Sequence, residues 1–289
     1  MSISTATYLL HPGHAAALPR WPTEVAALED STGKYEQRLG EGIQRLSELQ
    51  ERLYAQGRHA VLVIFQAMDA GGKDSAIKHV MSGVNPQGCQ VTSFKQPSSE
   101  ELGHDFLWRC ICRLPERGKI GIFNRSYYEE VLVTRVHPEL LEREHLSPAL
   151  LQAPHFWKHR YQSINDFETH LARNGTTVIK FFLHLSKQEQ KRRLLKRLEH
   201  ADKLWKFSRD DLRERAAWAQ YAKAYEHCLS ATSSEHAPWY IVPADSKKNT
   251  RLIISHILNE RLAALDLRHP RPGGISKAEA ATFRKRLGG

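Results

Sequence analysis

Residues 61 to 75, VLVIFQAMDAGGKDS, join a run of apolar residues directly to a glycine turn. Five consecutive apolar residues, Val61 to Phe65, are typical of a strand that is covered on both faces of a parallel sheet. The turn ends in Gly71-Gly72-Lys73, and glycine permits the backbone conformations that a sharp turn requires. A helix-compatible segment, 75–81, follows. The segment therefore predicts a strand-turn-helix unit of an α/β fold.

The turn is similar to the phosphate-binding P-loop, G-x-x-x-x-G-K-[ST], although two positions differ. Ala67 stands at the first glycine position, and Asp74 stands at the hydroxyl position, with Ser75 one residue later. Backbone N–H groups, a lysine charge and a helix N-terminus together can bind the oxygens of a phosphate group. Asp69, inside the turn, is a candidate metal ligand. The alternative is an ordinary glycine-rich turn in which Lys73 is solvated.

Short apolar runs alternate with helical stretches from His59 onward, as in a series of β-α-β units. This pattern predicts a three-layer α/β/α sandwich with a five-stranded parallel sheet. We divide the chain into an N-terminal helical arm (1–58), a core (59–268) and a C-terminal tail (269–289). The expected strands are 60–66, 90–95, 119–124, 177–185 and 239–243, and the expected helices lie near 73–83, 99–113, 125–137, 151–173, 187–200, 209–231 and 246–266.

Each of the first three expected strands ends in a polar cluster. The clusters span 69–75, 94–100 and 124–129. Because ligands of parallel sheets bind outside the carboxyl ends of the strands, we expect these clusters to meet at one site.

The chain of 289 residues carries a formal net charge of +10. Ten basic and five acidic residues lie between Lys191 and Arg215, so this stretch holds half of the excess charge. Such a stretch is either a solvated basic face or a surface for a polyanion. Charge by itself does not choose among nucleic acid, a membrane and a phosphate polymer.

The sequence contains no apolar run of the roughly 20 residues that a membrane span needs. The N-terminus also lacks the basic start and long apolar stretch of a signal peptide. The four cysteines do not have the spacing of a zinc site, so we expect reduced thiols and a cytoplasmic location, without a membrane partner.

Four segments together resemble the family-2 polyphosphate kinases over residues 35–268. They are FQAMDAGGKDSAIKHVMSGVNPQGCQVTSFKQPS, IGIFNRSYYEEVLVTRVHPE, DKLWKFS and APWYIVPADSKKNTRL, in this order. The resemblance implies a P-loop kinase fold like that of thymidylate kinases, with a basic helical lid at about 187–215. It also implies reversible, Mg²⁺-dependent phosphoryl transfer between inorganic polyphosphate and nucleotides, with Mn²⁺ as a substitute metal, in a homodimer or homotetramer.

The NRSYYE segment is similar to the subgroup that accepts both AMP and ADP, and guanine nucleotides are a second candidate. Asn124 stands where many members of the family have aspartate. The resemblance and the chemistry of phosphoryl transfer together assign catalytic roles to Asp69, Lys73, Asn124, Arg125 and Glu129, with Asp69 as the metal ligand. Glu129 is assigned from the transfer chemistry. Phosphate or polyphosphate binding is assigned to Ala70, Gly71, Gly72, Asp74, Ser75, Lys95, Arg193, Arg197, Lys203 and Lys206, of which Lys95 is assigned from the transfer chemistry.

Two other functions are compatible with a phosphate-binding turn in a basic chain. One is a nucleotide kinase of the thymidylate kinase type, which uses ATP as the donor. The other is a basic nucleic-acid-binding protein. No nucleic-acid-binding module is recognisable in the sequence, and the basic stretch belongs to the same core as the glycine turn, so we expect no nucleic-acid partner.

Overall fold

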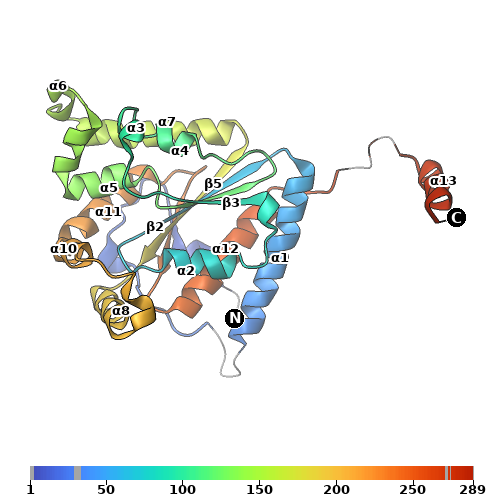
Figure 1. Cartoon of the computed structure of the whole chain (residues 1–289), viewed down its shortest axis with the longest axis horizontal. Coiled ribbons are helices and arrows are strands. Elements are labelled where there is room, and N and C mark those ends of the chain that lie inside the picture. Colours follow the sequence, from blue (N-terminus) through green and yellow to red (C-terminus); the bar gives the residue numbers. More distant parts are fainter. Residues whose placement is uncertain (1–2, 29–33, 271–272, 274, 289) are drawn as a thin grey trace.

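The structure, a computed structural model, describes residues 3–28, 34–270, 273 and 275–288. At its centre lies a sheet with the strand order β1-β6-β5-β2-β4-β3 (Figure 1). Neighbouring strands from β6 to β3 pair in parallel, which confirms the α/β fold and the five parallel strands that the sequence predicts. These strands are β2 (Ala60–Ala67), β3 (Cys89–Ser93), β4 (Ile120–Asn124), β5 (Thr176–His184) and β6 (Trp239–Pro243).

The sheet has a sixth strand, which corrects the prediction of a five-stranded sheet. β1 (Leu9–Leu10) comes from the N-terminal arm and pairs antiparallel with β6, with Leu9 opposite Tyr240. A strand of two residues is too short to show the alternation by which strands are recognised in a sequence. The arm is thus joined to the sheet edge by main-chain hydrogen bonds that its sequence pattern does not reveal.

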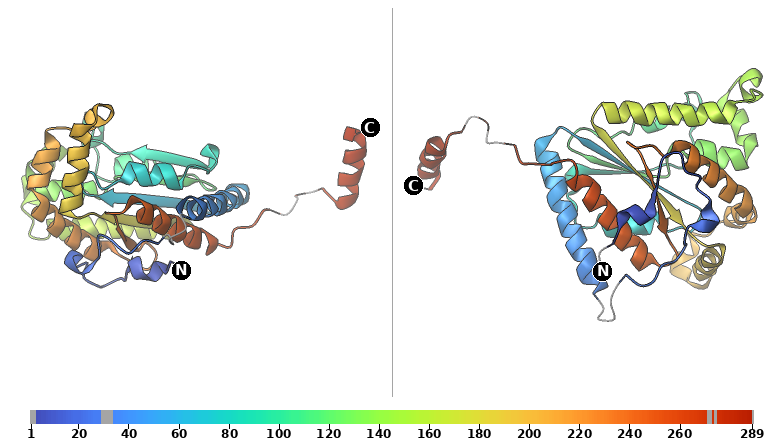
Figure 2. Two further views of the ribbon diagram at one scale, coloured as in Figure 1. Left: turned by 90° about the horizontal axis from the view of Figure 1, so that it is seen from below. Right: turned by 180° about the vertical axis from the view of Figure 1, so that it is seen from behind.

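Helices cover both faces of the sheet (Figures 1 and 2). Alternate residues of β2 belong to two separate cores: Val61, Val63 and Phe65 to one, Leu62 and Ile64 to the other. The first core includes side chains of α1 (Tyr35–Gln56), α2 (Lys73–Val80) and α12 (Lys247–Ala263), and the second includes those of α5 (Glu129–Val136), α7 (Phe156–Arg173) and α11 (Trp218–Thr232).

Four of the expected helices differ from the structure. The helix expected near 99–113 is two short helices, the one expected near 151–173 begins only at Phe156, and the one expected near 209–231 is interrupted before Trp218. The helix expected from residue 125 begins only at Glu129. Arg125 cannot belong to it, because its φ of +64° lies outside the right-handed helical region. The remaining elements are η1 (Thr5–Tyr8), η2 (Leu18–Arg20), η3 (Pro86–Gly88), α3 (Ser99–Leu102), α4 (Trp108–Ile111), η4 (Pro138–Glu144), α6 (Pro148–Leu151), α8 (Lys187–Glu199), α9 (Ala201–Leu204), α10 (Asp210–Ala216) and α13 (Lys277–Gly288).

Across the described ranges, every helix is too short or too polar to cross a lipid bilayer.

Candidate phosphate-transfer site

The glycine turn between β2 and α2 adopts a conformation that small residues permit. A Cβ atom at Gly71 would lie 2.5 Å from the Cβ atom of Ala67 and 2.8 Å from the carbonyl oxygen of Met68, so no side chain fits there. Gly72 has a φ of +96° and Ala70 a φ of +59°, both in the left-handed region. The N–H of Gly71 donates to the carbonyl of Met68 at 3.0 Å, so this amide already closes the turn.

Helix α2 begins immediately after the turn, and no side chain caps its first amides. The uncapped N-terminus of a helix attracts anions, because its first N–H groups lack partners within the helix. Lys73, the first residue of α2, is only 9% exposed, and its Nζ donates to the carbonyl of Ala67 at 3.0 Å. The lysine is therefore held inside the turn, which excludes the solvated lysine of the alternative interpretation.

The electrostatic surroundings of Lys73 show that the predicted site residues come together. Burial, and next the positive charge of Arg125, lower the pKa of Lys73 to about 8, whereas Asp69, Glu129 and Asp74 act in the opposite direction. A lysine with such a pKa keeps its charge at neutral pH.

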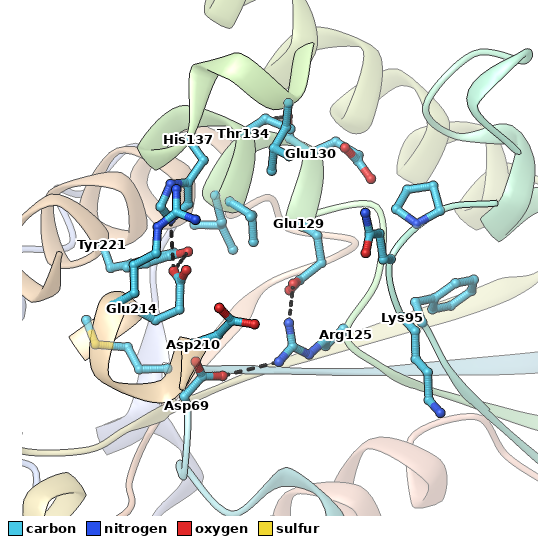
Figure 3. Close-up of a pocket in the computed structure, with 18 of the residues that line it drawn as sticks. Asp69, Lys95, Arg125, Glu129, Glu130, Thr134, His137, Asp210, Glu214 and Tyr221 are labelled. Atoms are coloured by element: carbon cyan, nitrogen blue, oxygen red, sulfur yellow. Dashed lines mark hydrogen bonds and ion pairs between the residues drawn. The ribbon is translucent and has the colours of Figure 1, made fainter. Parts of the chain in front are cut away.

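Arg125 lies between two of these carboxylates at the carboxyl end of β4 (Figure 3). Its guanidinium donates to Glu129 at 2.9 Å and to Asp69 at 3.2 Å. The backbone N–H of Arg125 donates to the carbonyl of Phe65 on the neighbouring strand at 3.1 Å. This bond holds the backbone of Arg125 against β2, and the left-handed φ of Arg125 redirects the chain beyond it. The guanidinium reaches Asp69 in the glycine turn.

Asn124, the last residue of β4, contacts the first turn of α2. Its Nδ2 donates to Oδ1 of Asp74 at 2.5 Å, and a longer contact of 3.4 Å reaches the hydroxyl of Ser93. Lys95, beyond the end of β3, is exposed and lines the same cleft as Arg125. The polar clusters after the first three parallel strands therefore lie at one edge of the sheet, as the sequence predicts.

The basic segment 187–215 forms α8, α9 and α10, and its four predicted phosphate ligands differ in their surroundings. Arg193 is 9% exposed, and its guanidinium donates to the carbonyls of Ala70 and Ala244 at 3.0 and 2.5 Å. Arg193 also forms an ion pair of 2.7 Å with Glu189. It thus connects α8 to the glycine turn through main-chain acceptors.

The other three residues lie further along the segment. Arg197 donates to the carbonyl of Lys206 at 3.2 Å and pairs with Asp211 at 3.4 Å. The ammonium of Lys206 lies 5.0 Å from the centre of the Trp205 ring, and Lys203 is partly exposed. Within the described residues, no hydrogen bond or ion pair connects these three side chains to the glycine turn.

A cleft of about 720 Å³ opens beside the turn. Asp69, Arg125 and Glu129 line it, and Phe94 and Pro97 contribute apolar surface from the segment that follows β3. At one end, Arg109 pairs with Glu130 at 3.2 Å, and burial raises the pKa of Glu130 to about 7 against the opposing effect of Arg109. At the side of α10 and α11, Glu214 accepts hydrogen bonds from His137 and Tyr221, as Figure 3 shows. The remaining lining residues include Leu102, Leu132, Leu140, Trp218 and Tyr225.

Several residues of this region were missed by the sequence analysis. Gln190 donates to the main-chain carbonyl of Asp69 at 3.0 Å, and Arg251 on α12 donates to the hydroxyl of Ser75 at 2.8 Å. Arg251 lies in the segment APWYIVPADSKKNTRL, so the resemblance pointed to the segment without indicating the contact. Arg109 and Glu130 are 21 positions apart in the chain, so a local sequence pattern does not predict that they form an ion pair.

Comparison with known proteins is consistent with this geometry. The sequence model of the family described as "Polyphosphate kinase 2" matches residues 29–270. The chain is 52% identical to the ADP-polyphosphate phosphotransferase of Rhodopseudomonas palustris over 99% of both chains. It is 44% identical to the AMP/ADP-polyphosphate phosphotransferase of Meiothermus ruber, over 93% of this chain and 97% of that one.

Among solved structures, the crystal structure of polyphosphate kinase 2 from Arthrobacter aurescens superposes with a TM-score of 0.87 and 38% identity. The superposition covers 98% of this chain and 97% of that chain. The match thus extends from the sequence to the whole arrangement of strands and helices. The chain belongs to the polyphosphate kinase 2 family.

Proposed function

We propose that this protein catalyses reversible, Mg²⁺-dependent phosphoryl transfer between inorganic polyphosphate and the nucleotides AMP and ADP. Family membership and the activities after which the two relatives are named support this function. The main structural support for this function is that four charged side chains lie close together where the glycine turn borders the cleft. They are Lys73, Asp69, Arg125 and Glu129. A polymer bound at the turn and a nucleotide bound in the cleft would present their phosphates to each other there.

The cleft is the better site for the nucleotide. Its volume of about 720 Å³ is typical of a ligand pocket, and it combines apolar side chains with a few charged groups. Arg125 would bind the terminal phosphate, because a guanidinium offers a planar fork of donors that matches phosphate oxygens. The apolar side chains of Leu132, Leu140 and Trp218 would surround the nucleoside.

The polyphosphate chain would lie on the other side of the turn, over the N-termini of α2 and α12. Arg251 lies on this side, since its guanidinium donates to the hydroxyl of Ser75 in the first turn of α2, and the buried Lys73 is the first residue of that helix. The pKa of Lys247 is lowered by burial and then by the charges of Arg193, Arg251 and Lys196, so several cations gather beside the turn. Arg197, Lys203 and Lys206 would contact the phosphates of the substrates when the segment 187–215 closes over them.

Phosphoryl transfer requires positioning of the reacting phosphates and neutralisation of their charge, with little covalent help from the protein. Lys73 and Arg125 would neutralise charge on the bridging and transferred phosphates. The acceptor is a phosphate oxygen that is already anionic at neutral pH. The reaction therefore does not require a residue that removes a proton.

Asp69 fits the role of a Mg²⁺ ligand. Mg²⁺ commonly binds one or two carboxylates and takes its other ligands from water and substrate phosphates. In the described residues no three carboxylate, histidine or cysteine side chains are grouped as a metal site, but Asp69 is partly exposed and lines the cleft beside Lys73 and Arg125. Mg²⁺ or Mn²⁺ bound there would neutralise phosphate charge and hold the two substrates together.

The decisive experiment supplies the protein with ADP, Mg²⁺ and long-chain polyphosphate in the absence of ATP. Formation of ATP is expected, and formation of ADP is expected when AMP replaces ADP. An ATP-dependent nucleotide kinase would show no transfer from polyphosphate but would phosphorylate a nucleoside monophosphate with ATP. A nucleic-acid-binding protein would show neither reaction and would retain DNA or RNA in the presence of excess polyphosphate.

Two further points of the proposal rest on the family. We propose that adenine nucleotides are preferred, with guanine nucleotides as second substrates, and that the protein forms a homodimer or homotetramer. Replacing ADP with GDP in the same assay tests the first point. Light scattering of the purified protein tests the second, and a mass equal to one chain would contradict it.

A further inference from the structure

A lysine and a glutamate form an ion pair in the core of the molecule, remote from solvent. Lys180 lies in the middle of β5 among apolar residues, Glu168 lies on α7, and both side chains are 0% exposed. Their Nζ and Oε2 atoms are 2.6 Å apart. A buried ion pair contributes little net stability, because removing two charges from water costs about as much as their attraction returns. Stability alone therefore does not account for its presence.

The hydrogen bonds of this pair reach the segment that carries Arg125. Lys180 donates to Glu168, to the hydroxyl of Tyr128 at 2.9 Å and to the carbonyl of Thr232 at 2.7 Å, so all three ammonium hydrogens have acceptors. The hydroxyl groups of Tyr127 and Tyr128 each donate to Oε1 of Glu168 at 2.7 Å. We call Glu168, Lys180, Tyr127 and Tyr128 the buried network.

The two tyrosines follow Arg125 by two and three residues and fix the chain on the inner side of the site. Between them and Arg125 lies Ser126, whose hydroxyl accepts from Gln66 Nε2 and from the N–H of Tyr128, both at 3.2 Å. All three residues, Ser126, Tyr127 and Tyr128, are fully buried. Arg125 itself holds a left-handed backbone conformation, which for a residue other than glycine persists only where its surroundings enforce it.

We propose that the buried network positions Arg125 for phosphoryl transfer. Its members are positioning residues: they anchor the segment after β4 from within the core, so that the guanidinium projects between Asp69 and Glu129 at the glycine turn. The ion pair supplies what an apolar pair could not, namely an acceptor that orients two tyrosine hydroxyl groups at once. This inference rests on the proposed function only in treating Arg125 as a phosphate-binding group.

The test removes the two hydroxyl groups and keeps the rings, in the variant Tyr127→Phe/Tyr128→Phe. Activity is measured with whichever phosphate donor the wild-type protein uses, so a wrong assignment of the donor would not be mistaken for a failure of this inference. We expect kcat to fall roughly tenfold to a hundredfold, as for other small displacements of reacting groups, with a smaller change in KM. Glu168→Gln should give the same pattern, because it leaves the ammonium of Lys180 without its counter-charge.

Repeating the double substitution in a protein that already carries Arg125→Lys distinguishes a loss of positioning from a general loss of structure. In Arg125→Lys, which lacks the planar fork, the double phenylalanine substitution should lower kcat by no more than about twofold further, since the two changes act through one group. An equal loss in the wild-type and Arg125→Lys backgrounds would refute the proposal. So would an unchanged kcat in the double variant in the wild-type background.

Ser233→Ala is the matched control in the same core. It removes a buried hydroxyl that donates to the carbonyl of Leu10 at 2.6 Å and accepts from the N–H of Trp239 at 3.2 Å, and it leaves the main-chain carbonyl of Thr232 that binds Lys180 in place. We expect a lower free energy of unfolding in urea with kcat unchanged. If the double phenylalanine variant does not fold, Tyr127→Phe alone replaces it, because Tyr127 donates to Glu168 without contacting Lys180. Its loss of kcat must likewise vanish in Arg125→Lys, or the proposal is wrong.

Discussion

Lys73 is the buried cation of the glycine turn, and its ammonium group donates to a main-chain carbonyl there. Replacing Lys73 by alanine should lower kcat by about 10²- to 10³-fold, the usual loss when a preorganised electrostatic contact is removed. Lys78, exposed on the same helix, provides the control, and Lys78→Ala should retain full activity. Steady-state kinetics of the folded variants measures both. A fully active Lys73→Ala variant would disprove the assignment of the phosphate site.

The lowered pKa of Lys73 predicts a dependence of activity on pH. Because the pKa of Lys73 is about 8 in the free protein, the ammonium is charged below this pH and becomes neutral above it. Since kcat/KM reports ionisations of the free enzyme, kcat/KM for polyphosphate should fall as the pH rises through about 8. Lys73→Arg keeps its charge at all these pH values. If this variant shows the same decline, another group is responsible.

Asn124 is expected to influence the choice between AMP and ADP. Asn124→Asp would place a second carboxylate against Asp74, where the amide now donates a hydrogen bond. The added negative charge beside the acceptor site should shift preference away from AMP, measured as the ratio of kcat/KM for AMP to that for ADP. The double variant Asn124→Asp/Asp74→Asn restores one amide and one carboxylate in exchanged positions. An unchanged ratio in Asn124→Asp would rule out this role.

At the scale of secondary-structure elements, two buried side chains of α8, Gln190 and Arg193, bind main-chain carbonyls of the glycine turn, and Arg193 makes the larger number of contacts. Arg193→Met removes the ion pair with Glu189 and the bonds to three main-chain carbonyls, those of Ala70, Ala244 and Asp245. We expect the free energy of unfolding to fall by roughly 3 kcal/mol, because the loss leaves buried acceptors without donors.

Arg192→Met is the matched control for this prediction. Arg192 pairs with the same Glu189, but its side chain is 67% exposed. Exposed ion pairs contribute about 0.5 kcal/mol, so urea unfolding should separate the two variants clearly. Equal losses would show that the main-chain contacts of Arg193 do not hold α8 against the turn.

At the scale of the whole molecule, the net charge of +10 predicts that polyphosphate binding depends on salt. The affinity for long-chain polyphosphate should fall about tenfold or more when salt rises from about 50 to about 200 mM, because bound counterions are released from the polymer. Pyrophosphate contacts fewer cations and should show a shallower dependence. Fluorescence titration measures both slopes, and a slope for the polymer that is no steeper than that for pyrophosphate would contradict a basic binding surface.

The order of strands and helices could largely be predicted from the sequence because each depends on neighbours along the chain. Five apolar runs predicted the five parallel strands, and Ser186 caps α8 by accepting from the N–H of Glu189, as a local capping pattern indicates. For the candidate site, the sequence predicted only which polar clusters come together. Parallel strands place their carboxyl ends together, so residues after β2 and β4 had to approach one another.

The sequence by itself determined the glycine turn, the α/β class and the family, since these depend on local backbone chemistry and on ordered motifs. Only the tertiary structure decided that Lys73 is buried, that Arg193 binds main-chain carbonyls, and that Lys180 reaches the tyrosines behind Arg125. The physical reason is that burial and hydrogen-bond partners depend on residues far apart in the chain. Lys180 is recognisable in the sequence as an unusual charged residue within an apolar strand. Its hydrogen-bond partners on α7, on α11 and after β4 come together with it only when the helices pack on the sheet.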